Sequence, residues 1–235
     1  MPTRPVTVAI VDYGLGNLYS VKQACAHVGA QASITSAKNE ILEADAIILP
    51  GVGAFGDAMD TLRALDLVTV IRGVVDSGRP VLGVCLGMQL LMTESHEFGR
   101  REGLGIIDGP VVRFDHPRDG ERQLKVPQIG WNAIARPTTD QRLTDPWRGT
   151  LLDGIADGEP MYFVHSYTVQ PSDPQVILAT STYGGIRFCS SLQRRNVVAC
   201  QFHPERSGTQ GLRIYRNFAN GIARTRDGEL ARVEG

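Results

Sequence analysis

In the first half of the chain, short apolar runs alternate with segments whose apolar residues recur every three or four positions. Residues 6–12 form a β-branched run that ends at a glycine-rich turn, and residues 18–28 follow with the helical pattern. Three further strands and one helix are expected, at 32–35, 46–50, 80–84 and 57–71, the helix burying Ala58, Leu62, Leu65 and Val68. Strands that alternate with amphipathic helices predict an α/β fold with a mostly parallel sheet and helices on both faces.

The second half of the chain changes character. Strand-like runs separated by Pro, Asp and Gly turns predict an antiparallel extension of the sheet, and they occur at 161–164, 176–180, 186–190 and 197–202. The charged stretch 115–125 is expected to be a solvated loop, and 211–223 has helical spacing. We therefore predict one domain over 1–223, followed by a polar, mobile C-terminal tail over 224–235.

Composition and charge disfavour several classes of function. The chain holds 24 Lys and Arg against 25 Asp and Glu, so it has no basic field for binding nucleic acid. The longest uncharged stretch, 80–93, is too short to span a membrane, and the N-terminus lacks a secretory signal pattern. The four cysteines show no CxxC spacing, which argues against a disulfide framework or a thiolate metal site. We expect a cytoplasmic protein that uses no metal and no cofactor.

The segment Gly83-Val84-Cys85-Leu86-Gly87 lies where an apolar strand runs into a helical pattern. Glycines on both sides of a nucleophile let neighbouring chain approach a sharp strand-to-helix turn, so this is a nucleophile-elbow pattern with cysteine in place of serine. Such a thiol projects from the carboxyl end of the sheet, where the helix N-terminus stabilises its thiolate. Taken alone, the pattern also fits a small core cysteine in a glycine-rich turn.

The segment His203-Pro204-Glu205 strengthens the catalytic interpretation. Proline keeps the preceding residue extended, and in an extended chain the side chains at i and i+2 face the same way. Glu205 can therefore lie beside the His203 imidazole and fix its orientation and tautomer, as the third member of a Cys-His-acid triad does. By itself, this segment also fits a histidine at a strand end near a surface glutamate.

Residues 50–56, Pro-Gly-Val-Gly-Ala-Phe-Gly, follow a strand and precede a helix. They match GxGxxG, but a dinucleotide site needs an acidic residue at the end of the next strand, and Cys85 occupies that place. We therefore expect the backbone N–H groups of Gly51 to Gly53 to face an oxyanion, together with the N–H of Leu86. The flexible glycines would also let this loop change its conformation.

Three further segments each have two interpretations. Gln89, one turn into the elbow helix, either faces the pocket and binds a polar substrate or faces solvent. The sequence His165-Ser166-Tyr167 favours an ordinary polar strand end. Trp131, within residues 127–132, is either a hydrophobic anchor or part of a partner surface. The residue patterns alone do not decide among these possibilities.

Four motifs together resemble those of the class I, triad-type glutamine amidotransferases: GVCLGMQLL around Cys85, PGVGAF from Pro50, FVHSY from Phe163 and QFHPERSG from Gln201. Two more, DYGLGN from Asp12 and PQIGWN from Pro127, make the chain similar to the family of glutaminase subunits of imidazole glycerol phosphate synthase. The resemblance extends over residues 6–218. It implies the flavodoxin-like amidotransferase fold.

The resemblance implies a role for each matching position. Cys85 would be the nucleophile, His203 the general base and then acid, and Glu205 its orienting carboxylate. The substrate would be glutamine. The partner would be a cyclase subunit with a (β/α)8 barrel, forming a heterodimer in which ammonia passes to the cyclase and the cyclase activates the glutaminase. Further roles are implied in the oxyanion hole for Val52, Gly53 and Leu86, in glutamine binding for Gly51, Gln89, Ser166 and Tyr167, and in partner contact for Asn17, Trp131 and Arg206.

Two alternatives and two departures from the family pattern accompany this interpretation. A different triad amidotransferase, such as the glutaminase of anthranilate or pyridoxal phosphate synthesis, would keep Cys85 and His203, but DYGLGN and PQIGWN disfavour it. A non-catalytic scaffold has no physical need for an intact Cys-His-Glu set. Arg206 stands where Lys is common and Gln128 where His is common, and Arg keeps the cation but changes its shape.

Overall fold

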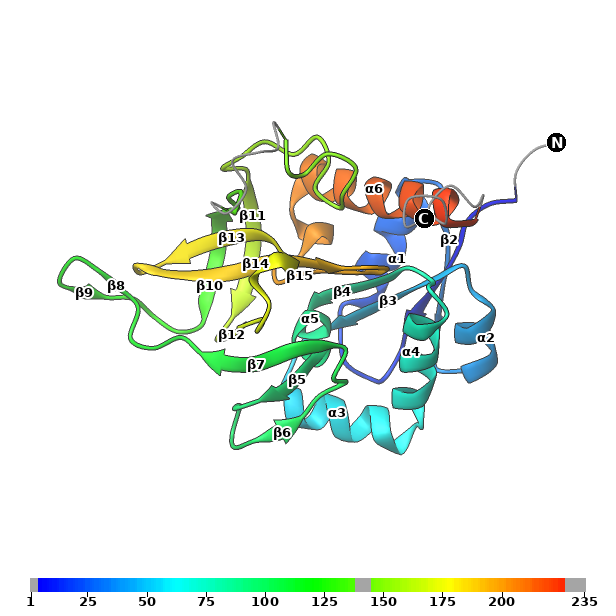
Figure 1. Ribbon diagram of the computed structural model, residues 1–235, viewed down its shortest axis with the longest axis horizontal. Coiled ribbons are helices and arrows are strands. Elements are labelled where there is room, and N and C mark those ends of the chain that lie inside the picture. The colour runs from blue at the N-terminus through cyan, green and yellow to red at the C-terminus, as the bar shows by residue number, and fades with distance from the viewer. Residues whose placement is uncertain (1–3, 138–144, 227–235) are drawn as a thin grey trace.

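The computed structural model describes residues 4–137 and 145–226 (Figure 1). The strands of the central sheet are β1 Thr7–Val11, β2 Gln31–Thr35, β3 Ala46–Gly51, β4 Val81–Cys85, β13 Ile177–Tyr183, β14 Ile186–Arg194 and β15 Val197–Cys200. Their order is β13-β14-β15-β4-β3-β1-β2. The strands from β15 to β2 run parallel, whereas β13 and β14 pair antiparallel with their neighbours. The predicted mostly parallel sheet with an antiparallel extension is confirmed.

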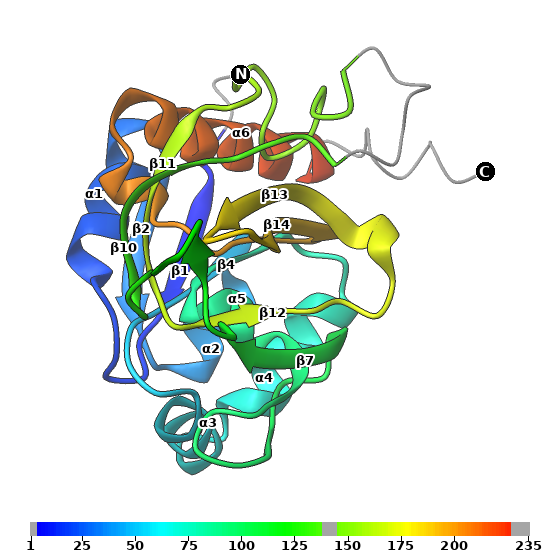
Figure 2. The ribbon, with the colours of Figure 1, turned by 90° about the vertical axis from the view of Figure 1, so that its left-hand side faces the viewer.

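Helices cover both faces of this sheet, as the alternating pattern predicts. They are α1 Leu18–His27, α2 Lys38–Glu43, α3 Phe55–Ala64, α4 Leu67–Asp76, α5 Leu86–Leu90 and α6 Gly208–Arg226. In β1, Val8 and Ile10 pack with α1 and α6, whereas Ala9 and Val11 pack with the other helices. Figure 2 shows α1 and α6 above the sheet and α3 and α4 below it. Each strand therefore contributes to two cores, because its side chains alternate between the faces.

The single helix predicted over 57–71 is wrong, because the chain forms α3 and α4 with a break between them. Asp66, at the break, has a left-handed backbone with φ 53°. The buried residues of α3 and those of α4 would lie about a third of a turn apart on one continuous helix. Breaking the helix lets both faces reach the core. Leu65 is consequently 39% exposed and Val68 only half-buried, although both were predicted to be buried.

Two smaller sheets lie outside the central one. A four-stranded sheet contains β5 Met92–Ser95, β6 Arg101–Glu102, β7 Ile107–Arg113 and β12 Tyr167–Val169. The strand predicted at 161–164 is β11 Pro160–His165, and it pairs with β10 Gln128–Ala133 instead of extending the central sheet. Two short 3₁₀ helices complete the second half, η1 Pro174–Val176 and η2 Pro204–Arg206.

The charged stretch 115–125, predicted to be a loop, contains the small hairpin of β8 Arg118–Asp119 and β9 Arg122–Gln123. The strands are joined by two residues, of which Gly120 has a φ of 58° that glycine adopts without strain. All four strand residues are exposed. The stretch is therefore solvated, as predicted, but it is not irregular.

The last helix continues beyond the end predicted from its sequence pattern. Helix α6 ends at Arg226, so residues 224–226 are helical although they were predicted to belong to the tail. The rest of the predicted tail, 227–235, lies outside the described residues. Within the described part of the chain, no helix is long and apolar enough to cross a membrane.

Candidate active site

The carboxyl ends of β3, β4 and β15 bring together segments that are far apart in the sequence. Strand β4 lies between the other two, with Gly51 paired beside Cys85 and Cys200 paired beside Val84. The loop after β3, the elbow after β4 and the histidine segment after β15 therefore meet at one edge of the sheet. This is the place where ligands bind in open parallel sheets.

The turn at Cys85 has the geometry of a nucleophile elbow. Cys85 ends β4 and precedes α5 directly, with φ 54° and ψ −109°, a backbone conformation that non-glycine residues rarely adopt. A Cβ on Gly87 would overlap the carbonyl oxygen of Leu49, and one on Gly83 would lie 2.9 Å from Leu91 Cδ1. The two glycines are therefore needed for the close packing that holds the strained turn.

His203 and Glu205 form a buried pair at the end of β15. His203 Nδ1 lies 2.8 Å from Glu205 Oε1, and their side chains are 7% and 2% exposed. Burial alone would lower the pKa of His203, but hydrogen bonds to Cys85 and Glu205 outweigh it and raise that pKa to about 10. The imidazole therefore holds a proton at neutral pH, and its other nitrogen is left for Cys85.

Tyr215 of α6 lies under the carboxylate of this pair. Glu205 Oε2 and the Tyr215 hydroxyl are both buried. Burial, followed by the charge of Glu205, raises the pKa of Tyr215 well above its usual value. The phenol therefore stays protonated beside the carboxylate.

The loop after β3 is held against the elbow by the turn after β1. The Tyr13 hydroxyl donates to the Pro50 carbonyl at 2.5 Å, and a Cβ on Gly51 would overlap that hydroxyl. Gly53 has a φ of 119°, which favours glycine. Leu86 is the first residue of α5, so the helix offers its N–H no partner. Of the two predicted oxyanion-hole segments, one begins at Gly51, which is paired beside Cys85, and the other is Leu86, which directly follows Cys85.

Gln89, Ser166 and Tyr167 lie at the same edge. Gln89 Nε2 donates to the Tyr167 carbonyl and to Gln201 Oε1, both at 3.1 Å, so the side chain is buried instead of facing solvent. Ser166 is half-buried between β11 and β12. Because both N–H groups of the Gln89 amide are used, its carbonyl oxygen is the group left for a ligand.

The comparisons with known proteins agree with this geometry. Residues 9–222 match the family described as Glutamine amidotransferase class-I. The chain belongs to this family. It is 49% identical to "Imidazole glycerol phosphate synthase subunit HisH" of Syntrophotalea carbinolica, over 91% of this chain and 99% of that protein. It is 46% identical to the protein of the same name in Geobacter sulfurreducens, over 90% and 97%.

Solved structures share the amidotransferase fold at low sequence identity. The glutaminase domain of Trypanosoma brucei CTPS with bound acivicin superposes with a TM-score of 0.63 at 19% identity, covering 93% of this chain and 94% of that one. The structure of PurLQS from Thermotoga maritima gives 0.66 at 16% identity, covering 93% and 100%. These likenesses establish the fold alone.

Glu97 lies close to Tyr167 and to the start of α3, and sequence reasoning missed it. Its Oε2 accepts the N–H of Phe55 at 2.5 Å, at the start of α3. After burial, its charge is the next largest influence that raises the pKa of Tyr167. Glu97 lies in the turn between β5 and β6, where no local motif marks it, so only the folded structure brings it close to Tyr167.

His165 has the structural role that its position favours. It is buried against the rings of Phe114, Phe163 and Phe188, and its Nδ1 lies 2.9 Å from the Tyr167 carbonyl. Burial lowers the pKa of His165 to about 4. This histidine is therefore neutral at physiological pH, in contrast to His203.

The three residues predicted to contact a partner are exposed near the site. The Arg206 guanidinium lies over the Tyr162 ring at 4.4 Å, and the Trp131 and Tyr162 rings are 5.9 Å apart. Trp131 is 59% exposed, and Asn17, at the start of α1, is exposed as well. Because α1 packs against η2, Asn17 lies on the same side as Arg206, and Trp131 adjoins Arg206 through the Tyr162 ring.

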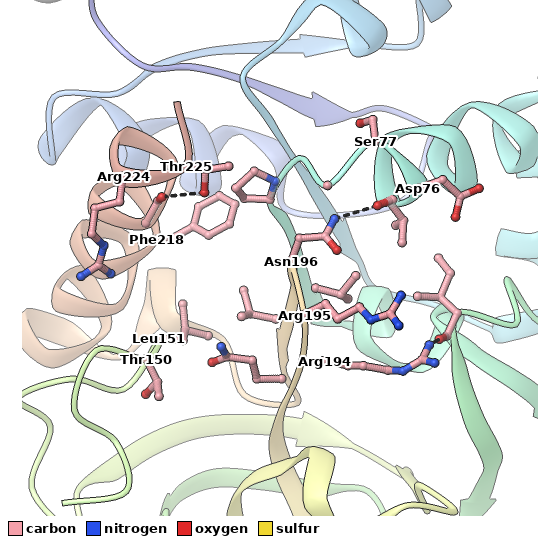
Figure 3. Close-up of a pocket in the computed structure, with 18 of the residues that line it drawn as sticks. Asp76, Ser77, Thr150, Leu151, Arg194, Arg195, Asn196, Phe218, Arg224 and Thr225 are labelled. Carbon is pink, nitrogen blue, oxygen red and sulfur yellow. Dashed lines mark hydrogen bonds between the residues drawn. The ribbon is translucent and has the colours of Figure 1, made fainter. Parts of the chain in front are cut away.

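A cavity of about 850 Å³ lies at the opposite end of the sheet (Figure 3). It is bordered by the end of α4, the turn between β14 and β15, and α6, and neither Cys85 nor His203 lines it. Asn196 donates there to the carbonyl groups of Val75 and Arg79, at 2.9 and 2.7 Å. Among the described residues, no group of three or more acidic, histidine or cysteine side chains could hold a metal ion.

Proposed function

We propose that this chain is the glutaminase subunit of an imidazole glycerol phosphate synthase, releasing ammonia from glutamine in histidine biosynthesis. Relatives of that name match nearly their whole length at 45–49% identity. The observation that carries the chemistry is the meeting of the Cys85 elbow with the buried His203–Glu205 pair at one sheet edge.

In the first half-reaction, the Cys85 thiolate attacks the side-chain amide carbon of glutamine. The carbonyl oxygen becomes an oxyanion, which the N–H groups of Leu86 and of the loop around Val52 and Gly53 stabilise. His203 carries a proton at neutral pH, and it gives this proton to the departing nitrogen. The C–N bond breaks, so ammonia and a γ-glutamyl thioester are formed.

In the second half-reaction, His203 takes a proton from water as the water attacks the thioester carbon. The C–S bond breaks, glutamate leaves and the thiolate returns. Glu205 holds the imidazole orientation throughout, because its Oε1 stays bonded to Nδ1. Two easier steps thus replace one difficult hydrolysis.

Glutamine would be held at the mouth of the site by Gly51, Gln89, Ser166, Tyr167 and Glu97. The α-ammonium group of the substrate needs an anionic partner, and Glu97 supplies a half-buried carboxylate beside Tyr167. Glu97→Gln keeps an oxygen that can accept the N–H of Phe55 but removes the charge. We expect KM for glutamine to rise about tenfold, with kcat within about twofold. A glutamine analogue without the α-amino group should be hydrolysed equally by both proteins.

The partner would be a cyclase subunit with a (β/α)8 barrel, bound as a heterodimer over Asn17, Trp131 and Arg206. Trp131 and Arg206 offer the exposed aromatic and guanidinium groups that are enriched at protein interfaces. Ammonia would pass to the cyclase, which completes the lyase reaction in the cytoplasm. We expect the cyclase to activate the glutaminase allosterically.

The loop around Gly53 would transmit this activation. A peptide between Val52 and Gly53 that turns its carbonyl inward removes one oxyanion donor, which lowers the rate roughly 100- to 1,000-fold. An alanine at position 53 fits the space but not the φ of 119°. Gly53→Ala should therefore change the basal and the stimulated rates by different factors. Identical factors would exclude this loop as the switch.

The test of the proposed function is glutamate release from glutamine by the purified chain. It is measured alone and with the cyclase subunit plus an analogue of the cyclase substrate, with Cys85→Ala as control. We expect a low rate alone, a strong increase with the liganded cyclase and no activity in the variant. High activity alone, or no response to that cyclase, would contradict the assignment to this synthase.

A further inference from the structure

Gln201 follows the last residue of β15 and contacts the elbow cysteine. Its side chain is completely buried. Gln201 Nε2 lies 3.6 Å from Cys85 Sγ, and Gln201 Oε1 lies 3.1 Å from Gln89 Nε2. One amide group therefore bridges the nucleophile and the first turn of α5.

The orientation of this amide follows from its neighbours. The Tyr167 carbonyl can only accept hydrogen bonds, so the Gln89 atom 3.1 Å from it must be the nitrogen. The same nitrogen faces the Gln201 amide, and its partner there must be an acceptor, Oε1. The remaining Gln201 group, an N–H donor, is thereby directed at Cys85 Sγ. The Tyr167 carbonyl thus fixes the orientation of the Gln89 amide, and the Gln89 amide fixes that of Gln201.

We propose that Gln201 is a catalytic residue that stabilises the Cys85 thiolate by donating an N–H to its sulfur. The proposal rests on the proposed function, in which this sulfur is the reacting atom. A donor stabilises charged sulfur more than it stabilises a thiol. The donor raises the fraction of Cys85 that is present as the attacking thiolate in the first half-reaction, and it stabilises the thiolate that leaves in the second.

Two other buried cysteines show how the surroundings of a thiol affect its ionisation. The thiols of Cys189 and Cys200 face backbone carbonyl oxygens, of Ser191 at 3.3 Å and of Gly83 at 4.0 Å. An acceptor favours the protonated thiol. Burial also raises the pKa of Cys189 to about 12 and that of Cys200 well above its usual value. The Cys85 thiol also faces a backbone carbonyl, that of Val164 at 3.7 Å, so Cys85 differs from them only by the additional side-chain amide donor that faces its sulfur.

The first experiment measures the pH dependence of alkylation of Cys85 by iodoacetamide in the full chain and in Gln201→Met. Methionine has a similar length but no donor. We expect the alkylation rate at pH 7 to fall about tenfold and the midpoint of the profile to move up by about one pH unit. With the cyclase subunit present, kcat for glutamine should fall about ten- to one-hundredfold, while KM stays within about twofold.

Gln193→Met is the matched control, because Gln193 lies on the neighbouring strand β14 at the far end of the sheet. It should leave the alkylation profile of Cys85 unchanged. Peptide mass spectrometry identifies the alkylated cysteine, and Cys85→Ala gives the background. Should Gln201→Met not fold, Gln89→Met removes the group that orients the Gln201 amide. It should shift the midpoint in the same direction by a smaller amount.

Unchanged alkylation in Gln201→Met and Gln89→Met would overturn the proposal, as would an equal loss in Gln193→Met. Failure of the proposed function has a separate signature. If the wild-type chain never releases glutamate, even with the cyclase subunit, the proposed glutaminase function is wrong. A shifted alkylation profile in that same chain would still support the contact between Gln201 and the thiolate.

Discussion

The two ends of the central sheet use buried and half-buried polar side chains in opposite ways. At the carboxyl ends of β4 and β15, hydrogen bonds join side chains that can react: His203 donates to Glu205, and Gln201 donates to Cys85. At the amino ends, several side chains that border the 850 Å³ cavity donate to backbone carbonyl groups instead. Arg72, for example, donates to the Leu104 carbonyl at 2.8 Å.

This difference shows why the size of a cavity is a poor guide to function here. Arg72, Arg194 and Asn196, which border the cavity, fasten loops to one another, because their N–H groups bond to main-chain carbonyl oxygens. The catalytic edge is nearly closed, and Cys85 is only 5% exposed. The two ends are distinguished by the partners of their hydrogen bonds, and not by the volume of a cavity. Side chains bond to reactive side chains at the carboxyl end and to main-chain carbonyl groups at the amino end.

Among the variants that distinguish the chemical end of the sheet from its structural end, the largest effect is expected from Cys85→Ala. Removing the nucleophile should lower kcat for glutamine by at least about 10⁴-fold, because the remaining groups only bind and polarise the substrate. Cys189→Ala removes another buried cysteine of the same sheet. It should keep kcat within about twofold in the same glutamate-release assay. A large loss in both variants would show that the assay reports packing and not chemistry.

The strained elbow is tested by two glycine substitutions. Gly87→Ala places a Cβ against the Leu49 carbonyl oxygen and should lower the free energy of unfolding by roughly 3 kcal/mol. Gly73→Ala, within α4, meets nothing within 4 Å and should raise it by about 0.5–1 kcal/mol. Urea unfolding measures both. Equal effects would mean that close packing at the elbow is not what requires glycine.

Buried, neutral His165 should make the free energy of unfolding depend on pH. The pKa of His165 is lowered by burial to about 4, so the unfolded chain binds its proton more readily. Its contribution is therefore present above pH 6.5 and is lost as the pH falls toward 4, by up to about 3 kcal/mol. In His165→Phe, unfolding free energies measured from pH 7.5 to 4.5 should fall less steeply than in the wild type.

The exposed His27 provides the control for this pH experiment. His27→Gln changes an exposed side chain outside the aromatic cluster around His165, so the slope measured for it is the reference for His165→Phe. A slope that His165→Phe leaves unchanged would contradict a neutral, buried His165.

The smallest expected loss of stability belongs to the amino end of the sheet. Asn196→Ala removes two hydrogen bonds, to the carbonyl groups of Val75 and Arg79. It should cost about 2 kcal/mol of unfolding free energy. Glutamine hydrolysis at 25 °C should keep its kcat/KM within about twofold. A specific loss of kcat/KM in a fully folded variant would break the division between a chemical and a structural end.

Much of this site is local enough to be predicted from the sequence. Glycines at 83 and 87 mark the elbow, and proline at 204 sets the spacing that brings Glu205 beside His203. The fold class follows from strands and helices that alternate with their expected periods. These features depend on residues within a few positions of one another, so sequence patterns contain them.

The missed features depend on contacts between distant segments. Glu97 reaches the start of α3 from a separate hairpin, and Gln201 is placed by the pairing of β15 with β4. A polar residue inside the apolar run 197–202 was the one signal that pointed to Gln201. The break at Asp66 was missed because it depends on where two buried faces meet the core.

The measurement that tests the central claim most directly is the capture of the covalent intermediate. The chain is mixed with glutamine in the presence of the cyclase subunit, quenched in acid within the first turnover, and examined by intact and peptide mass spectrometry. The account predicts a γ-glutamyl group on Cys85 and on no other cysteine. Release of glutamate at full rate with no adduct on Cys85, or with an adduct on another residue, would contradict it.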